Sequence, residues 1–189
     1  MHRVNIALDP RHCALVLVDY QERLLPEIRG GAALVAEAQR LADCARALGV
    51  RVIGTEQNPR GLGPGAAAIR SRCEVTVAKM HFDACADGLA DVLRLPGRPA
   101  PTDVVIAGCE THVCLLQTAH GLQRAGFGVW VAANACGTRH ADDHELALAR
   151  LRQSGAVMAS VEMIAFEWLR SCENERFRAV LEILKAPRG

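Results

Sequence analysis

Thr102-Asp-Val-Val-Ile-Ala-Gly-Cys-Glu-Thr-His-Val-Cys114 is the stretch around which the chain is organised. Its apolar, β-branched run over residues 104–107 is typical of a strand that is buried on both faces, and a glycine ends the run. From Val113 onward, apolar residues recur at helical spacing. The pattern predicts a buried strand, a short polar turn, and a helix that has Cys114 just inside its beginning.

A thiol at the start of a helix feels the partial positive charge of the helix N-terminus, which favours the thiolate form. For a single cysteine out of the eight in this chain, a buried structural role is the more frequent one. The case for chemistry at Cys114 therefore depends on residues elsewhere in the sequence.

Composition limits the class of protein. The chain has 189 residues, 50% of them apolar, and a net charge of +1 with acidic and basic residues interspersed. No basic patch indicates nucleic acid or a membrane surface, so we expect a small-molecule substrate. The N-terminal residues lack the apolar core of a signal peptide, and the cysteines lack paired zinc spacing. We expect a cytoplasmic protein with free thiols, no metal and no cofactor.

Apolar runs alternate with helical patterns along the whole chain. Strands are predicted at residues 13–18, 51–55, 74–78, 104–107, 128–133 and 156–159. Helices are predicted at residues 30–49, 86–95, 142–154 and 162–184, and residues 56–65 are predicted to form a loop. This alternation predicts an α/β fold, a three-layer α/β/α sandwich with a six-stranded, mainly parallel sheet. We expect a single domain over residues 1–189, with a core at about 13–169 and a C-terminal helical segment at 170–185.

Three polar residues follow predicted strands at or near their carboxyl ends, where ligands bind in such sheets. Asp19 follows the first strand, Lys79 follows the third, and Cys114 lies beyond the fourth. Considered alone, Asp19 could be explained as a helix cap and Lys79 as a solvated surface residue. Their coincidence at one sheet edge indicates a functional site.

These three side chains suit nucleophilic catalysis. A cysteine needs a base to accept its proton or a cation to stabilise its charge, and Asp19 and Lys79 supply both. Backbone N–H groups of the turn before Cys114 offer stabilisation for an oxyanion. The combination predicts hydrolysis at a carbonyl group through a thioester.

Four segments carry a resemblance to a known family. They are Leu17-Val-Asp-Tyr-Gln21, Thr55-Glu-Gln-Asn-Pro-Arg-Gly-Leu-Gly63, Ala78-Lys79 with Phe82, and Gly108-Cys-Glu-Thr-His-Val-Cys114. In order and spacing they resemble the isochorismatase-like cysteine hydrolase superfamily, which has a Rossmann-like fold. The Gln57-Asn-Pro and Glu110-Thr-His segments most resemble its branch of isochorismatase domain-containing hydrolases.

The resemblance implies a role for each matching residue. Cys114 would be the nucleophile, Asp19 the proton shuttle and Lys79 the third member of a triad. A cis peptide bond at Cys109–Glu110 is implied, with the N–H groups of Glu110 and Cys114 forming an oxyanion hole. Residues expected to line the substrate pocket are Tyr20, Gln21, Leu25, Phe82, Thr111 and His112.

The resemblance also bears on substrate, metal and assembly. Isochorismate cleavage breaks a vinyl ether without a cysteine nucleophile, so Cys114 favours the amidases of the superfamily. The metal-binding histidines of nicotinamidases are missing, because no histidine lies between His12 and His81. A homo-oligomer, dimer or tetramer, is implied, and the amphipathic segment at 169–184 offers an apolar side that could cover a neighbouring subunit.

Several alternatives remain open. Cys109 near Cys114 is compatible with a thiol-based redox protein, and a catalytically idle scaffold member of the family is a further possibility. His140 and His144 have the spacing of a metal-binding helix face, although a polar helix N-terminus, with Asp142 or Asp143 as its cap, explains them better. His112 lies too close in sequence to Cys114 to serve readily as its base.

Overall fold

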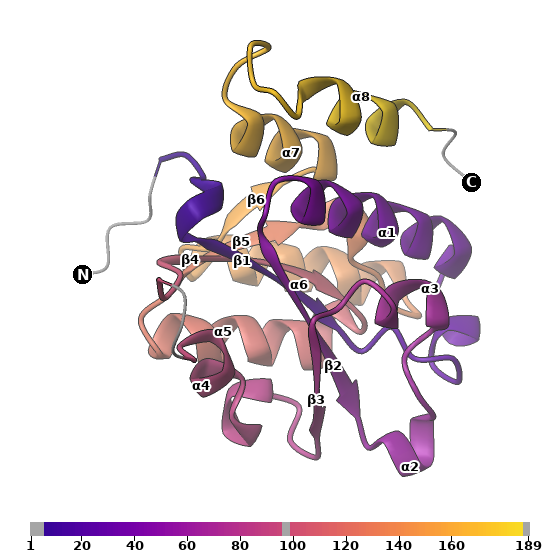
Figure 1. Ribbon diagram of the computed structural model, residues 1–189. Helices are drawn as coiled ribbons and strands as arrows, with labels where there is room; N and C mark the ends of the chain where they lie inside the picture. The colour runs from indigo at the N-terminus through magenta and orange to yellow at the C-terminus, as the bar shows by residue number, and fades with distance from the viewer. Residues whose placement is uncertain (1–5, 96–98, 187–189) are drawn as a thin grey trace.

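The computed structural model describes residues 6–95 and 99–186. Its centre is one sheet of six strands in the order β3-β2-β1-β4-β5-β6 (Figure 1). The strands are β1 Cys13–Val18, β2 Arg51–Gln57, β3 Val75–Lys79, β4 Asp103–Gly108, β5 Gly128–Ala132 and β6 Val157–Ala159. Every neighbouring pair is parallel. The predicted α/β fold with a six-stranded parallel sheet is confirmed.

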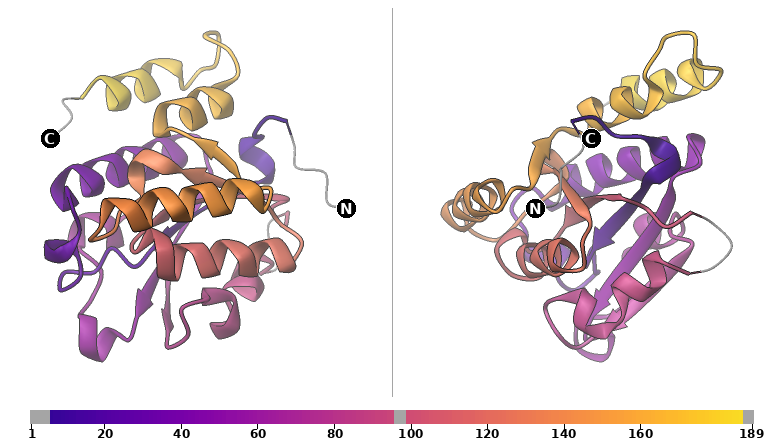
Figure 2. Two further views of the ribbon diagram at one scale, coloured as in Figure 1. Left: turned by 180° about the vertical axis from the view of Figure 1, so that it is seen from behind. Right: turned by 90° about the vertical axis from the view of Figure 1, so that its left-hand side faces the viewer.

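Helices cover both faces of the sheet. They are α1 Gly31–Ala47, α2 Pro59–Leu62, α3 Ala67–Arg70, α4 Leu89–Leu93, α5 Leu116–Arg124, α6 Ala141–Gln153, α7 Val161–Leu169 and α8 Phe177–Lys185. α1 and α7 lie on one face with α8 outside them, and α4, α5 and α6 lie on the other (Figures 1 and 2). None of the helices in the described part of the chain is long and apolar enough to cross a membrane.

β1 and β4 form the middle of the core, and all of their residues are buried. Val18 at the end of β1 pairs with Gly108 at the end of β4. A Cβ atom at Gly108 would overlap the carbonyl oxygen of Val18, so only glycine permits the two backbones to approach this closely. The close approach joins the strand ends from which the candidate site is built.

The C-terminal segment differs from the prediction of one continuous helix over 162–184. α7 ends at Leu169, Arg170 adopts a left-handed conformation (φ 61°), and α8 begins only at Phe177. The apolar side of α8 packs against α1 and α7 of the same chain, where Val180 is fully buried. Its own chain covers this side only in part, since Phe177, Ile183 and Leu184 are partly buried, and a contact of this side with a neighbouring subunit stays a prediction.

Two smaller differences concern the loops. β2 continues to Gln57, and α2 occupies part of the predicted loop at 56–65. The predicted helix at 86–95 is instead a short 3-10 helix, Ala84–Asp87, followed by α4. The extension of β2 matters most, since it brings Gln57 level with Lys79 of β3.

Candidate active site

The three predicted catalytic residues meet at the carboxyl edge of the sheet. Asp19 directly follows β1 and has a left-handed backbone (φ 54°), and Lys79 is the last residue of β3. Cys114 lies in a π-helical turn, Thr111–Leu115, between β4 and α5. Because the strand order reverses between β1 and β4, this edge is where open parallel sheets form their ligand sites.

Asp19 and Lys79 form an ion pair inside the protein. Lys79 Nζ lies 2.8 Å from Asp19 Oδ2, and both side chains are 0% exposed. The Thr55 hydroxyl donates a hydrogen bond to the other carboxylate oxygen at 2.6 Å. Burial of two charges is stable only when they are paired and hydrogen-bonded, so the three groups hold one another in place.

Gln57 is the fourth polar side chain of this cluster, beside Asp19, Lys79 and Thr55. Its side-chain oxygen accepts a hydrogen bond from Lys79 Nζ at 2.6 Å, and its amide nitrogen donates to the Met80 carbonyl at 2.8 Å. The second bond fixes which end of the amide faces Lys79. The same Gln57 oxygen lies 3.9 Å from Cys114 Sγ, so it links the lysine to the thiol.

Cys114 is buried, with 6% of its surface exposed. The pKa of its thiol is raised to about 12, mainly by burial; the charge of Asp19 adds to this rise and that of Lys79 opposes it. The helix start therefore does not hold Cys114 as a thiolate, contrary to the sequence-based expectation, because desolvation outweighs the helix charge. In the resting site the proton stays on sulfur, beside the Asp19–Lys79 ion pair.

The turn before Cys114 begins with a cis peptide bond at Cys109–Glu110. No hydrogen bond is made by the Glu110 N–H among the described residues. The Glu110 carboxylate is held by the Thr138 hydroxyl at 2.8 Å and by Arg139 Nε at 3.0 Å. These contacts fix the turn and leave one backbone donor available near the thiol.

The isochorismatase domain family model matches residues 13–163. The chain belongs to the isochorismatase family. It is 35% identical over 180 residues to isochorismatase domain-containing protein 2A of Mus musculus, and the match covers 94% of this chain and 85% of that protein.

Two solved structures share the isochorismatase-family fold over nearly the whole chain. The MAR1 ribonuclease of Caenorhabditis elegans has a TM-score of 0.88 and 27% identity, with 96% of this chain and 94% of that chain covered. The YcaC gene product of Escherichia coli is described as an octameric hydrolase of unknown specificity. It has a TM-score of 0.86 and 25% identity, and the match covers 96% of this chain and 90% of the E. coli chain.

Of the six residues that are expected to line the substrate pocket of this isochorismatase-family chain, Tyr20 and Gln21 are buried and make hydrogen bonds within the protein. The Tyr20 side chain is buried, and its hydroxyl donates to the Ala135 carbonyl. Gln21 is fully buried, and its amide bonds only to protein: to both backbone groups of Gln57 and to the Gly63 carbonyl. Gln21 thus positions Gln57, and its amide oxygen and nitrogen are both engaged by the protein rather than by a substrate.

The other four expected pocket residues lie around the turn and its rim. Leu25 begins a short 3-10 helix, Leu25–Glu27, and is partly buried, whereas Phe82 is 50% exposed. Thr111 is buried and bonds to His144 Nδ1 at 3.0 Å, and His112 Nδ1 bonds to the Thr138 hydroxyl at 2.8 Å. Their contact with a substrate remains a prediction.

Thr55 and Gln57 are the site residues that sequence reasoning did not assign. Both belong to β2, which lies between the strands that supply Asp19 and Lys79. The signal that could have found them is the order of the strands: side chains at the end of a middle strand must face those of its neighbours. Within the described residues, no group of three histidine, cysteine or acidic side chains could hold a metal ion.

Proposed function

We propose that this protein is a cysteine-dependent hydrolase that cleaves a small amide-like C–N bond through a thioester on Cys114. The observation that carries the proposal is the position of the Cys114 thiol beside the fully buried Asp19–Lys79 ion pair: its sulfur lies 3.9 Å from the Gln57 oxygen that Lys79 also binds, and both charges act on its pKa. A carboxylate and an ammonium group beside a thiol provide a base and a stabilising cation at one point.

The reaction begins with proton transfer from Cys114 to Asp19. The sulfur then bonds to the substrate carbonyl carbon, and negative charge develops on the carbonyl oxygen. When the C–N bond breaks, Asp19 returns the proton to the leaving nitrogen, which departs as ammonia or an amine. A water molecule attacks the thioester with Asp19 as base, the C–S bond breaks, and the thiol regains its proton as the carboxylic acid leaves.

The high pKa of the thiol favours general-base catalysis over a preformed thiolate. At neutral pH a thiol with a pKa of about 12 is almost entirely protonated, so the nucleophile forms only when Asp19 accepts its proton. Lys79 Nζ, 2.8 Å from Asp19 Oδ2, holds the carboxylate in place for this transfer. The same protonated state disfavours the redox alternative, because peroxide reacts with thiolates.

The Glu110 N–H supports an oxyanion hole with the N–H of Cys114. It has no hydrogen-bond partner among the described residues and lies in the turn that presents the thiol. A developing oxyanion would supply the missing acceptor, and stabilisation of this kind is worth about 3–4 kcal/mol per donor in acyl transfer. Catalysis needs no metal or cofactor in this scheme.

The experiment that tests the function is a substrate panel of primary amides, ureides and carbamates with ammonia release as the readout. We include a short RNA in the panel because the C. elegans neighbour is named a ribonuclease. Turnover of an amide-type compound, accompanied by an acyl adduct on Cys114 in intact-mass spectra, supports the proposal. Cleavage of RNA alone, without an adduct, contradicts it.

Asp19→Asn separates the charge of Asp19 from its role as proton shuttle. The variant loses a negative charge that raises the pKa of Cys114, while Lys79 remains, so we expect the pKa of the thiol to fall. Iodoacetamide should then alkylate Cys114 at lower pH than in the wild type, even though turnover drops. Peptide mapping across pH 7–10, in a Cys172→Ser background that removes the exposed thiol, measures this shift. An unchanged profile would show that Asp19 does not act on the thiol.

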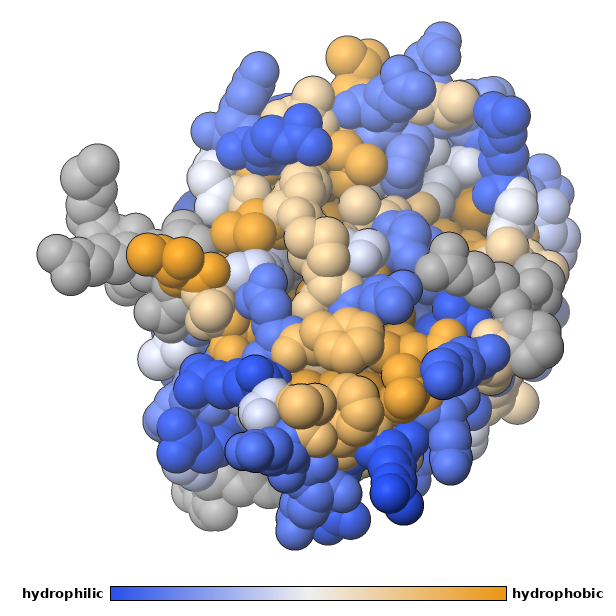
Figure 3. Space-filling view, turned by 90° about the horizontal axis from the view of Figure 1, so that it is seen from above, coloured by the Kyte–Doolittle hydropathy of each residue, from blue (hydrophilic) through white to orange (hydrophobic). Residues whose placement is uncertain are grey.

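We also propose a homo-oligomer in the cytoplasm. The E. coli neighbour is octameric, and α7 exposes Met163 (53%) and Phe166 (40%). Apolar side chains also gather on the face of the molecule that is seen from above in Figure 3. All eight cysteines are free, which is the usual state in a reducing compartment. Light scattering should give a dimer, a tetramer or a larger multiple of 20.3 kDa. A stable species of 20.3 kDa at micromolar concentration would exclude the oligomer.

A further inference from the structure

The turn that presents Cys114 is held by a neighbouring segment, residues 137–139, which lies between β5 and α6. Gly137 makes two backbone hydrogen bonds to residues 108–111, at 3.0 and 3.2 Å. The segment therefore runs alongside the residues that lead from β4 into the turn. Side-chain contacts between the two segments bear on how the turn is oriented.

The Glu110 carboxylate is the point where the two segments meet. Its Oε2 accepts three hydrogen bonds: from the Thr138 hydroxyl at 2.8 Å, from Arg139 Nε at 3.0 Å and from the Arg139 N–H at 3.2 Å. Burial favours the neutral carboxyl, but these hydrogen bonds outweigh it and lower the pKa of Glu110. At neutral pH the group is a carboxylate, which accepts hydrogen bonds and donates none.

Thr138 is the buried part of this contact. It is 3% exposed, whereas the Arg139 side chain is 51% exposed, so solvent screens the Arg139 ion pair and weakens it. Thr138 has one hydroxyl proton and donates it to Glu110. His112 Nδ1, 2.8 Å from the same hydroxyl oxygen, must then be the donor in its own bond to Thr138. One buried hydroxyl thus binds two residues of the turn, Glu110 and His112.

We propose that Thr138 is a positioning residue for acyl transfer at Cys114: by holding Glu110 and His112, it keeps the Glu110 N–H directed at the acyl oxygen. This inference rests on the proposed hydrolase function. An N–H group stabilises an oxyanion best when it is already oriented as the charge develops, and a displacement of about 1 Å can cost about 100-fold in rate. Thr138 acts through Glu110 and exchanges no proton with the substrate.

Two reagents that react with Cys114 in different ways test this role. p-Nitrophenyl acetate acetylates the thiol: an S–C bond forms at the carbonyl carbon, an oxyanion develops, the ester C–O bond breaks to release p-nitrophenolate, and Asp19 accepts the thiol proton. Iodoacetamide alkylates the same thiol at a saturated carbon with loss of iodide and of the thiol proton, and no oxyanion develops. A residue that positions the oxyanion donor should affect the first reaction and not the second.

Thr138→Val removes the hydroxyl at nearly constant volume. It should slow acetylation of Cys114 by about 10- to 100-fold and leave its alkylation within about twofold of the wild type, because only the oxyanion donor is displaced. Thr138→Ser keeps the hydroxyl and should restore acetylation. The acetylation rate is the release of p-nitrophenolate after subtraction of the Cys114→Ala background, and peptide mapping gives the alkylation rate.

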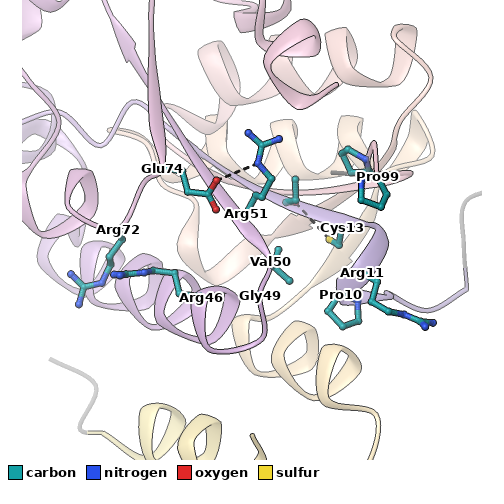
Figure 4. Close-up of a pocket in the computed structure, with 12 residues that line it drawn as sticks. Pro10, Arg11, Cys13, Arg46, Gly49, Val50, Arg51, Arg72, Glu74 and Pro99 are labelled. Atoms are coloured by element: carbon teal, nitrogen blue, oxygen red, sulfur yellow. Dashed lines mark hydrogen bonds and ion pairs between the residues drawn. The ribbon is translucent and has the colours of Figure 1, made fainter. Parts of the chain in front are cut away.

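Thr102→Val is the matched control. The Thr102 hydroxyl also donates to a carboxylate at 2.8 Å, that of Asp103. Asp103 begins β4 at the opposite edge of the sheet and pairs with Cys13, which lines the cavity of about 470 Å³ shown in Figure 4. Thr102→Val should therefore react with both reagents at the wild-type rates.

Three results would overturn the inference: unchanged acetylation of the Thr138 variant, an equal loss in both reactions, or an equal loss in Thr102→Val. A wild type without Cys114-dependent release of p-nitrophenolate would instead overturn the proposed function, and this inference with it. Circular dichroism checks the fold of each variant. If Thr138→Val does not fold, Thr138→Ala removes the same hydroxyl without placing a methyl group beside the carboxylate, and it should slow acetylation in the same way.

Discussion

Replacement of Cys114 by alanine is expected to abolish turnover of any amide-type substrate, because no other nucleophile occupies that position beside Asp19. Asp19→Asn should lower kcat/KM by about 10²–10⁴, the usual cost of losing a general acid–base. The matched control is Cys172→Ala, which removes an exposed thiol outside the candidate site and should keep full activity. Steady-state ammonia release measures all three proteins.

The fold of each variant has to be checked at the same time. Asp19→Asn leaves the Lys79 ammonium buried without its counter-charge, which is expected to cost about 3–5 kcal/mol of stability. Cys114→Ala leaves that ion pair intact, so its melting temperature should stay close to that of the wild type. An active, folded Cys114→Ala protein would show that the thiol is structural and would end the thioester proposal.

Alkaline pH is expected to destabilise the protein strongly. Burial raises the pKa of Cys13, Cys44, Cys114 and Cys136 from 9.0 to about 12. A raised folded-state pKa gives stability that is complete below the unfolded value and is lost as the pH rises from about 9 toward 12. At pH 10 each thiol then favours the unfolded state by about 1.4 kcal/mol, roughly 6 kcal/mol for the four.

A loss of that size is comparable to the whole stability of a typical domain, about 5–15 kcal/mol. Denaturant unfolding at pH 7.5, 9 and 10, under reducing conditions, should show the free energy of unfolding falling across this range. Cys44→Ala, which removes one ionisable group from the α1–α7–α8 contact, should reduce the slope, whereas Cys172→Ala should leave it unchanged. A free energy of unfolding that stays constant up to pH 10 would contradict the prediction.

The strands could be predicted because their signal is local. Each is a short apolar run bounded by polar or turn residues, and the predicted bounds differ from the observed ones by two residues or fewer. The meeting of Asp19, Lys79 and Cys114 could be predicted because parallel strands place their carboxyl ends at one edge. What the sequence could not show depends on pairing and burial. β2 reaches Gln57 because it pairs with β3, and glycines and prolines nearby obscured this.

The pKa of the Cys114 thiol and the helix break after α7 also depend on contacts in the folded protein that the sequence does not show. The charge at the helix start is visible in the sequence, but the desolvation that raises the pKa of Cys114 is a property of the folded interior. The break after α7 involves neither glycine nor proline. There the Asn174 side chain bonds to the Leu169 carbonyl and ends the helix through a contact five residues away.

The order of the strands also bears on how the chain reaches its fold during synthesis. β1 pairs with β4 along its whole length, and Cys13 of β1 lies opposite Asp103, 90 positions later (103 − 13). At typical translation rates of about 5–20 residues per second, one edge of β1 waits roughly 5–20 s for its partner to leave the ribosome. An apolar strand with an unpaired edge is prone to aggregate in that interval, so chaperones that shield nascent strands should improve the yield of this protein.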